Sequence, residues 1–170
     1  MSAIALQSDG KWIIGGNFNK RITRINADGS VDSTFNIGAG ANGQIFAVAI
    51  QSDGKIIIGG DFTSVNGTSR NRIARLNLDG SLDLEFNIGS GINDRVYTLG
   101  LQADGKILIG GKFTTVNGVA RSRIARINID GSIDSFFNFS VSDAVRSLAI
   151  QKDGKILFVG DFTFCLLYTS

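Results

Sequence analysis

The chain repeats itself along its length, and this feature constrains its fold more than any other. The tripeptide Asp-Gly-Lys begins at positions 9, 53, 104 and 153. A second marker, Asp-Gly-Ser, begins at positions 28, 79 and 130, which are 51 residues apart. Self-similarity at such a period is the signature of solenoids, propellers and related arrays. The 170 residues therefore hold three units and part of a fourth.

Each unit contains short β-type segments separated by turn residues. In the third unit we predict them at 96–102, 107–111, 123–128 and 132–138. Asp-Gly between alternating apolar runs is a strong hairpin signal, and we expect a two-residue turn with positive φ at both residues. No stretch keeps an apolar period of 3.6 residues over ten residues, so we expect essentially no helix.

The first segment of each unit is apolar on both faces. In residues 45–50, Phe46, Val48 and Ile50 form a bulky face, while Ala47 and Ala49 form a small one. A sheet with one solvated face would alternate apolar with polar residues. These strands are therefore predicted to be covered on both sides, with the bulky side chains of one sheet filling the shallow face of the next.

These observations predict an all-β fold, a partial β-propeller built from four-stranded antiparallel blades with a repeat of about 51 residues. A β-sandwich or another repeat solenoid is the alternative. We place the units at about 3–44, 45–95 and 96–144, with an incomplete unit at 145–164.

Composition excludes several classes of function. Histidine is absent, which removes the usual general base and the commonest metal ligand. The net charge of +2 is too small to indicate binding to nucleic acid or to an anionic membrane. No apolar run approaches the roughly 18 residues of a membrane span. We therefore predict no nucleic-acid partner and no transmembrane segment.

Two segments carry a resemblance to a known family. The runs A-I-Q-S-D-G-K-I-I-I-G-G-D-F (49–62) and R-L-N-L-D-G-S-L-D-L-E-F-N (75–87) resemble the bacterial delta-60 repeat family, and the resemblance covers residues 3–164. The double glycines are also similar to those of kelch blades, although the later tyrosine and tryptophan of kelch blades are missing. The resemblance implies a propeller from a secreted or cell-surface bacterial protein, mostly without assigned activity.

Charged residues recur at fixed places in the units. The repeated pairs are Arg24 with Asp32, Arg75 with Asp83, and Arg126 with Asp134. Since an active site is needed only once, identical placement favours structural ion pairs over catalytic ones. The run from Asn77 to Asp83 resembles a calcium loop, but its frame would place Arg75 at the first ligand position, so we expect a hairpin turn there. We predict no catalytic residue, no metal site and no cofactor.

The binding prediction rests on the connections between the strands. In an antiparallel meander successive connections alternate between the two ends of a sheet, so the tight turns share one end and the long connections share the other. Length varies between units in the long connections, where binding specificity usually resides on a fixed scaffold. The candidate binding residues there are Asn66, Arg70, Asn93, Asp94, Arg95, Asn117 and Arg121.

The predicted function is a non-catalytic structural or interaction module of a bacterial surface or secreted repeat protein, with an unknown protein or glycan as its ligand. The alternative is part of a propeller-fold carbohydrate-active enzyme, a lyase or glycosidase, whose catalytic residues lie outside this chain. A closed propeller generally has four to eight blades, so we expect a fragment whose partners include the remaining blades of its parent. Residues 165–170, including Cys165, resemble a translated sequencing adapter and are predicted not to be native.

Overall fold

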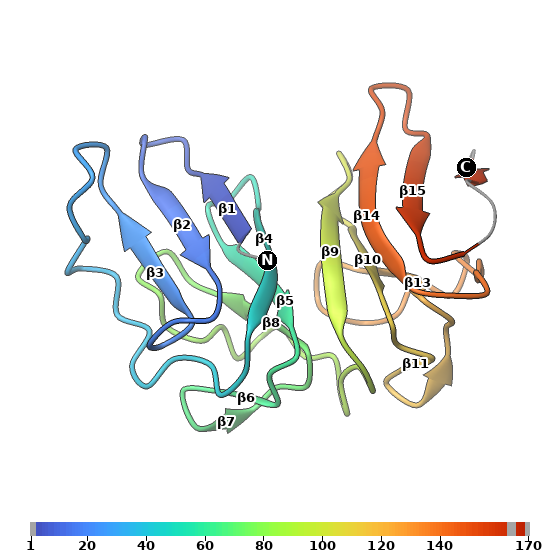
Figure 1. The fold of residues 1–170 in the computed structure, drawn as a ribbon, viewed down its shortest axis with the longest axis horizontal. Helices are drawn as coiled ribbons and strands as arrows, with labels where there is room; N and C mark the ends of the chain where they lie inside the picture. Colours follow the sequence, from blue (N-terminus) through green and yellow to red (C-terminus); the bar gives the residue numbers. More distant parts are fainter. Residues whose placement is uncertain (1–2, 163–165, 169–170) are drawn as a thin grey trace.

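The computed structural model describes residues 3–162 and, for the backbone alone, Leu166–Tyr168. These residues form four three-stranded antiparallel sheets arranged one after another (Figure 1). They contain no helix, and so none that could cross a membrane. The prediction of an all-β, propeller-type fold is confirmed in this arrangement.

In each three-stranded sheet the second of its strands in chain order lies in the middle. The sheets are β1 (Ala3–Leu6), β2 (Trp12–Gly15) and β3 (Ile22–Ile25); β4 (Ile45–Ile50), β5 (Ile56–Gly60) and β8 (Ile73–Leu76); β9 (Val96–Leu101), β10 (Ile107–Gly111) and β13 (Ile124–Ile127); and β14 (Val145–Ile150), β15 (Ile156–Gly160) and β16 (Leu166–Tyr168). Two small hairpins are inserted, β6 (Ser64–Val65) with β7 (Thr68–Ser69), and β11 (Thr115–Val116) with β12 (Val119–Ala120).

The hydrophobic core lies between successive sheets. The first strands β1, β4, β9 and β14 are neighbours in space, as Figure 1 shows. The bulky side of one first strand packs on a glycine of the preceding sheet, and a Cβ on Gly59 would lie 2.8 Å from Cγ1 of Val96. Every residue of β5 and of β10 is buried. The prediction of coverage on both faces is thus confirmed for the two middle sheets, whereas Ile4 and Leu6 of β1 are exposed because no described sheet packs on the outer face of the first sheet.

The fourth strand of each unit is shorter than predicted. It is reduced to one bridge, Leu76 with Leu82 in the second unit and Ile127 with Ile133 in the third. The chain then turns, and the backbone N–H of Phe137 donates to the carbonyl of Asp134 at 3.3 Å. This turn places the Phe137 ring in the core, where it is buried. Extension of the strand is lost because the phenylalanine fills the space between sheets.

The tight turns contain three residues. The N–H of Gly54 donates to the Gln51 carbonyl at 2.9 Å, and the Gln51 N–H donates to the Lys55 carbonyl at 2.8 Å. Gly54 and Gly105 both have φ of +83°, while the turn aspartates are not among the described non-glycine residues with positive φ. The expectation of positive φ at both Asp and Gly is wrong, because a three-residue loop needs it only at its last position.

A buried ion triad closes each of the first three units. Asp83 accepts hydrogen bonds from Arg75 Nε and Lys55 Nζ, both at 2.7 Å. The Arg75 guanidinium lies 4.9 Å from the centre of the Phe86 ring and donates to the Ile129 carbonyl of the next unit at 2.6 Å. The same triads surround Asp32 in the first unit and Asp134 in the third. The predicted structural ion pairs are confirmed, and the arginine of the second unit also joins two units together.

The last sheet takes its third strand from the tail. The backbone of β16 pairs with β15, with Tyr168 opposite Ile156, as Leu76 of β8 lies opposite Ile56 of β5. Cys165 and residues 169–170 lie outside the described residues. The non-native origin of residues 165–170 stays a prediction.

Candidate functional site

The long connections gather at one end of the sheets, as predicted. Two isolated bridges join them, Ala41 with Val65 and Ile92 with Val116. In Figure 1 the small hairpins occupy the lower end of the view, and tight turns such as that between β14 and β15 lie at the upper end. The second connections are hairpins rather than open loops, with Asn66-Gly67 and Asn117-Gly118 at positive φ in their turns. Asn-Gly is a hairpin signal that could have revealed them.

The three candidate asparagines hold these loops together. Asn66 Oδ1 accepts from the N–H of Ala39 at 3.1 Å, and Asn117 Oδ1 accepts from the N–H of Ser90 at 3.0 Å. Asn93 Oδ1 accepts from the N–H groups of Thr114 and Thr115, at 2.9 and 3.0 Å. Because these side chains bond to the backbone of a neighbouring loop, their contribution is to loop structure.

The charged candidates divide into two groups. The Nη1 groups of Arg70 and Arg121 donate to the carbonyl of the residue just before each, at 2.9 and 2.8 Å. Asp94 Oδ1 accepts from the N–H of Arg95 at 2.7 Å. The Arg95 side chain is exposed and lines a cleft with residues in or next to β4, β5, β9 and β14, strands of three sheets. Of the seven candidates, Arg95 is the one that contributes to this cleft.

The cleft is produced by a β-bulge that recurs at the start of the first strand. In β4, Ile45 lies opposite Gly60 and Ala47 opposite Gly59, so Phe46 has no partner in the ladder. Tyr97 in β9 and Arg146 in β14 are left out in the same way. A bulge turns a side chain away from its regular direction and is common beside functional sites.

The second glycine of the Gly-Gly pairs in β5 and β10 makes the bulge possible. A Cβ on Gly60 would lie 2.1 Å from the carbonyl oxygen of Gln44, and one on Gly111 would lie 2.0 Å from that of Arg95. No real side chain tolerates such distances to backbone atoms. The same carbonyl of Gln44 accepts from the N–H of Asp61 at 3.0 Å. Glycine is therefore required because the backbone before the first strand passes directly over this position.

The three bulged side chains meet. The rings of Phe46 and Tyr97 have centroids 5.5 Å apart and are inclined at 53°, and the Arg146 guanidinium lies 4.6 Å from the Tyr97 centroid. They line a cleft of about 360 Å³ together with Gln44, Asp61 and Arg95. Phe46 was predicted to pack against the neighbouring sheet with Val48 and Ile50, and this is wrong because the bulge turns it into the cleft.

The charges of the cleft are paired. Arg146 Nε donates to both carboxylate oxygens of Asp161 at 3.0 Å. Arg95 Nε lies 3.9 Å from Oδ2 of Asp61. The hydrogen bond with Arg146 lowers the pKa of Asp161, and the same bond raises the pKa of Arg146. The cleft thus places ionised groups of both signs beside aromatic rings.

The residues that form the cleft differ between units, while the frame around them repeats. Equivalent bulge positions hold phenylalanine, tyrosine and arginine, at 46, 97 and 146. The position after the Gly-Gly pair holds Asp61 and Lys112, and Asp161 stands at the matching place in the fourth unit. Such differences between equivalent positions are the sequence signal that could have identified Phe46, Tyr97, Arg146 and Asp61.

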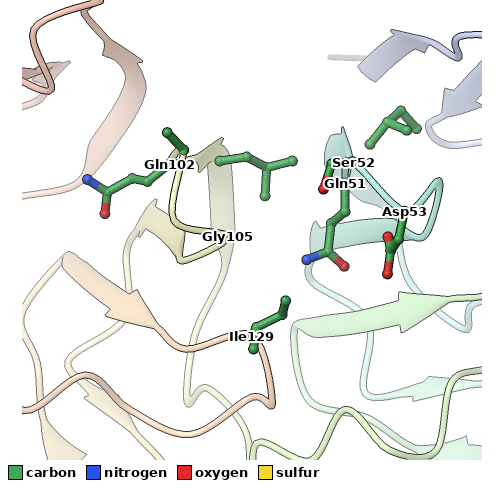
Figure 2. A pocket seen from close by; sticks show the side chains of 9 residues that line it. Gln51, Ser52, Asp53, Gln102, Gly105 and Ile129 are labelled. Atoms are coloured by element: carbon green, nitrogen blue, oxygen red, sulfur yellow. The ribbon is translucent and has the colours of Figure 1, made fainter.

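A second hollow, of about 410 Å³, lies between the tight turns of the second and third units (Figure 2). Gln51 and Asp53 line it from one unit, and Gln102 and Ile129 from the other. Gln51 is only 7% exposed. Its Oε1 has no hydrogen-bond partner among the residues that the structure describes, and the same holds for Oε1 of Gln7 in a similar groove between the first and second units. Since this groove recurs with the same residue types, we interpret it as a feature of packing between units.

Solved propellers resemble the structure. It matches the WD40 β-propeller domain of Doa1 with a TM-score of 0.64 and 17% identity over 93% of this chain and 46% of that one. Virginiamycin B lyase from Staphylococcus aureus matches with a TM-score of 0.57 and 20% identity, over 92% of this chain and 47% of that one. PorZ, described as a bacterial surface component of the type-IX secretion system of Porphyromonas gingivalis, matches with a TM-score of 0.62 and 15% identity, over 97% and 25%.

These likenesses establish the fold alone. The chain spans about half the length of the first two of these proteins. No protein of curated function matches the sequence.

A family profile matches the sequence in three places, residues 7–35, 51–86 and 102–137. Each match begins at the glutamine before an Asp-Gly-Lys turn and ends at the phenylalanine that enters the core. Together the matches cover more than half of the chain. The chain therefore belongs to the family described as domain of unknown function (DUF5122) beta-propeller.

Proposed function

We propose that this chain is a non-catalytic binding module of a bacterial surface or secreted repeat protein, and that its ligand lies in the cleft between Phe46, Tyr97 and Arg146. The observation that carries the proposal is the recurring bulge. The same backbone bulge occurs in β4, β9 and β14, and each time it directs a different side chain into the same cleft. Surface or secreted location follows the resemblance to delta-60 repeats, which also remains part of the proposal.

The ionisable groups of the cleft favour binding over catalysis. General acid–base catalysis works best with a group whose pKa lies near the working pH. The pairing of Arg146 with Asp161 moves both pKa values away from neutrality, because each ion stabilises the charged form of the other. Groups held permanently charged suit recognition, in which donors and acceptors must keep fixed roles.

The three segments matched by the family profile separate the bulged residues from the tight turns and ion triads. The bulged residues Phe46, Tyr97 and Arg146 all lie outside the three matched segments. The tight turns and the ion triads lie inside them, Lys11, Arg24 and Asp32 among others. The matched segments thus contain the turns and triads of the scaffold, together with Asp61 of the cleft, but none of the three bulged residues.

The proposal is tested by ligand-observed NMR with a mixed library of saccharide and peptide fragments. We compare the full chain with the double variant Phe46→Ala/Tyr97→Ala and with Ser52→Ala, a control in the groove between tight turns. Fragments that bind the unsubstituted chain should bind the double variant at least about tenfold more weakly. Their affinity for the control should be unchanged. Equal binding by all three proteins contradicts the placement of the site, and conversion of any fragment to a product contradicts the non-catalytic role.

A further inference from the structure

We infer that the cleft binds a neutral saccharide, with a sugar ring against Phe46 and Tyr97 and its hydroxyls at the paired charged groups. The inference rests on the proposed function, since it names the ligand class of the same cleft. Three properties of the described residues carry it: the shape of the aromatic surface, the balance of charge, and the mixture of donors and acceptors.

The aromatic surface is open to a ligand. Phe46 and Tyr97 are half-buried, and the inclination of 53° between their rings makes an angled wall rather than a closed stack. Arg146 lies beside Tyr97 and extends this wall. Ligand pockets generally combine such aromatic walls with a few polar groups that fix orientation. The C–H face of a sugar ring is apolar and flat enough to lie on this wall.

The balance of charge favours a neutral ligand. Clusters of arginine recognise carboxylate or phosphate when the guanidinium forks are free to form charge-assisted bonds. Here Arg146 is bonded to Asp161 through two oxygens, and Arg95 lies 3.9 Å from Asp61. An anion would have to displace or approach these carboxylates. A wholly apolar ligand would bury the charged groups without returning hydrogen bonds, which is costly.

The polar groups match the chemistry of sugar hydroxyls. A hydroxyl both donates and accepts, whereas a guanidinium only donates and a carboxylate only accepts. The Arg95–Asp61 separation of 3.9 Å is longer than a direct hydrogen bond. Both side chains are partly exposed, so this pair offers a donor and an acceptor to the same hydroxyl. The volume of about 360 Å³ lies toward the small end of ligand pockets, which suits one or two sugar rings.

The test begins with the full chain on an array of immobilised neutral hexose oligosaccharides, uronic-acid oligosaccharides, sulfated oligosaccharides and peptides. Calorimetric titration then follows with the neutral hexose oligosaccharide that gives the strongest signal. Tyr97→Ala should weaken this binding at least about tenfold, whereas Tyr97→Phe, which keeps the ring, should change it by less than about threefold. Phe136→Ala removes an aromatic ring that is 91% exposed outside the cleft, and it should have no effect.

The outcomes separate the inference from the proposed function. If only uronic-acid, sulfated or peptide probes bind, and Tyr97→Ala abolishes that binding, the saccharide class is wrong and the cleft remains the binding site. If neutral oligosaccharides bind equally well to the parent and to Tyr97→Ala, the cleft assignment and the proposed function both fail. Absence of binding by every neutral oligosaccharide at millimolar concentration also overturns the inference.

Discussion

The two ends of the sheets differ in which features recur from one unit to the next. At the tight-turn end the units repeat both backbone and side chains, as Asp32, Asp83 and Asp134 show with their lysine and arginine partners. At the bulges, near the other end, the backbone repeats while the side chains of Phe46, Tyr97 and Arg146 differ. In a repeat protein, residues that recur in every unit can therefore stabilise the fold, while residues that vary between units can bind a ligand.

The largest effect should come from breaking a triad. Asp83→Ala removes the acceptor of two cations, of which Arg75 is buried, and leaves that charge without its partner. Loss of one member of a buried ion pair costs about 3–5 kcal/mol. Urea unfolding of the parent, of Asp83→Ala and of the exposed turn control Asp53→Ala measures this difference. A loss below about 1 kcal/mol for Asp83→Ala would show that the triad is not a source of stability.

A smaller effect is expected from the glycine under the bulge. In Gly60→Ala the new Cβ meets the Gln44 carbonyl oxygen at 2.1 Å, so the backbone must move, at a cost of about 2 kcal/mol or more. Gly118→Ala is the matched control, because Gly118 has φ of +75° and, apart from its chain neighbours, no atom of the described residues lies within 4 Å of an added Cβ. It should lose only about 1 kcal/mol through backbone strain. Equal losses on unfolding would mean that close approach at the bulge does not require glycine.

Acid should weaken the tight-turn end through its triad carboxylates. Burial alone would raise the pKa of Asp134, but hydrogen bonds from Lys106, from the backbone of Phe136 and from Arg126 outweigh it and lower the pKa from 3.8 to about 2. The carboxylate is thus more acidic in the folded state, so its contribution to stability is complete above the unfolded value and declines as pH falls from 3.8 toward 2. The pKa of Asp32 is also lowered, first by its bond from Lys11.

Thermal unfolding across this interval measures the effect, with Asp134→Asn as the comparison. The variant should be less stable than the parent at neutral pH and should depend less on pH in the acid range. Parallel curves for the two proteins would show that titration of Asp134 does not contribute.

Sequence reasoning succeeded where the structure depends on local signals and failed where it depends on register. Asp-Gly turns and the bulky and small faces of residues 45–50 are properties of neighbouring residues, and they were enough to predict covered sheets in a propeller. The direction of Phe46 depends on which residue of β5 it faces, and one residue of slippage changes the face of a strand. Gly60 causes that slippage through contact with Gln44, sixteen positions earlier in the chain. Comparison of equivalent positions among the units would have identified the residues of the cleft even without knowledge of the strand register.

The most direct test of the division between the two ends is one double variant, Tyr97→Ala/Arg146→Ala, measured for both stability and binding. Both side chains lie partly or fully exposed at the bulge, outside the three buried clusters of the core. We predict a melting midpoint within about 4 °C of the parent, which corresponds to less than about 1 kcal/mol, together with loss of neutral oligosaccharide binding. A midpoint lowered as far as that of Asp83→Ala, or binding equal to that of the parent, would contradict the account.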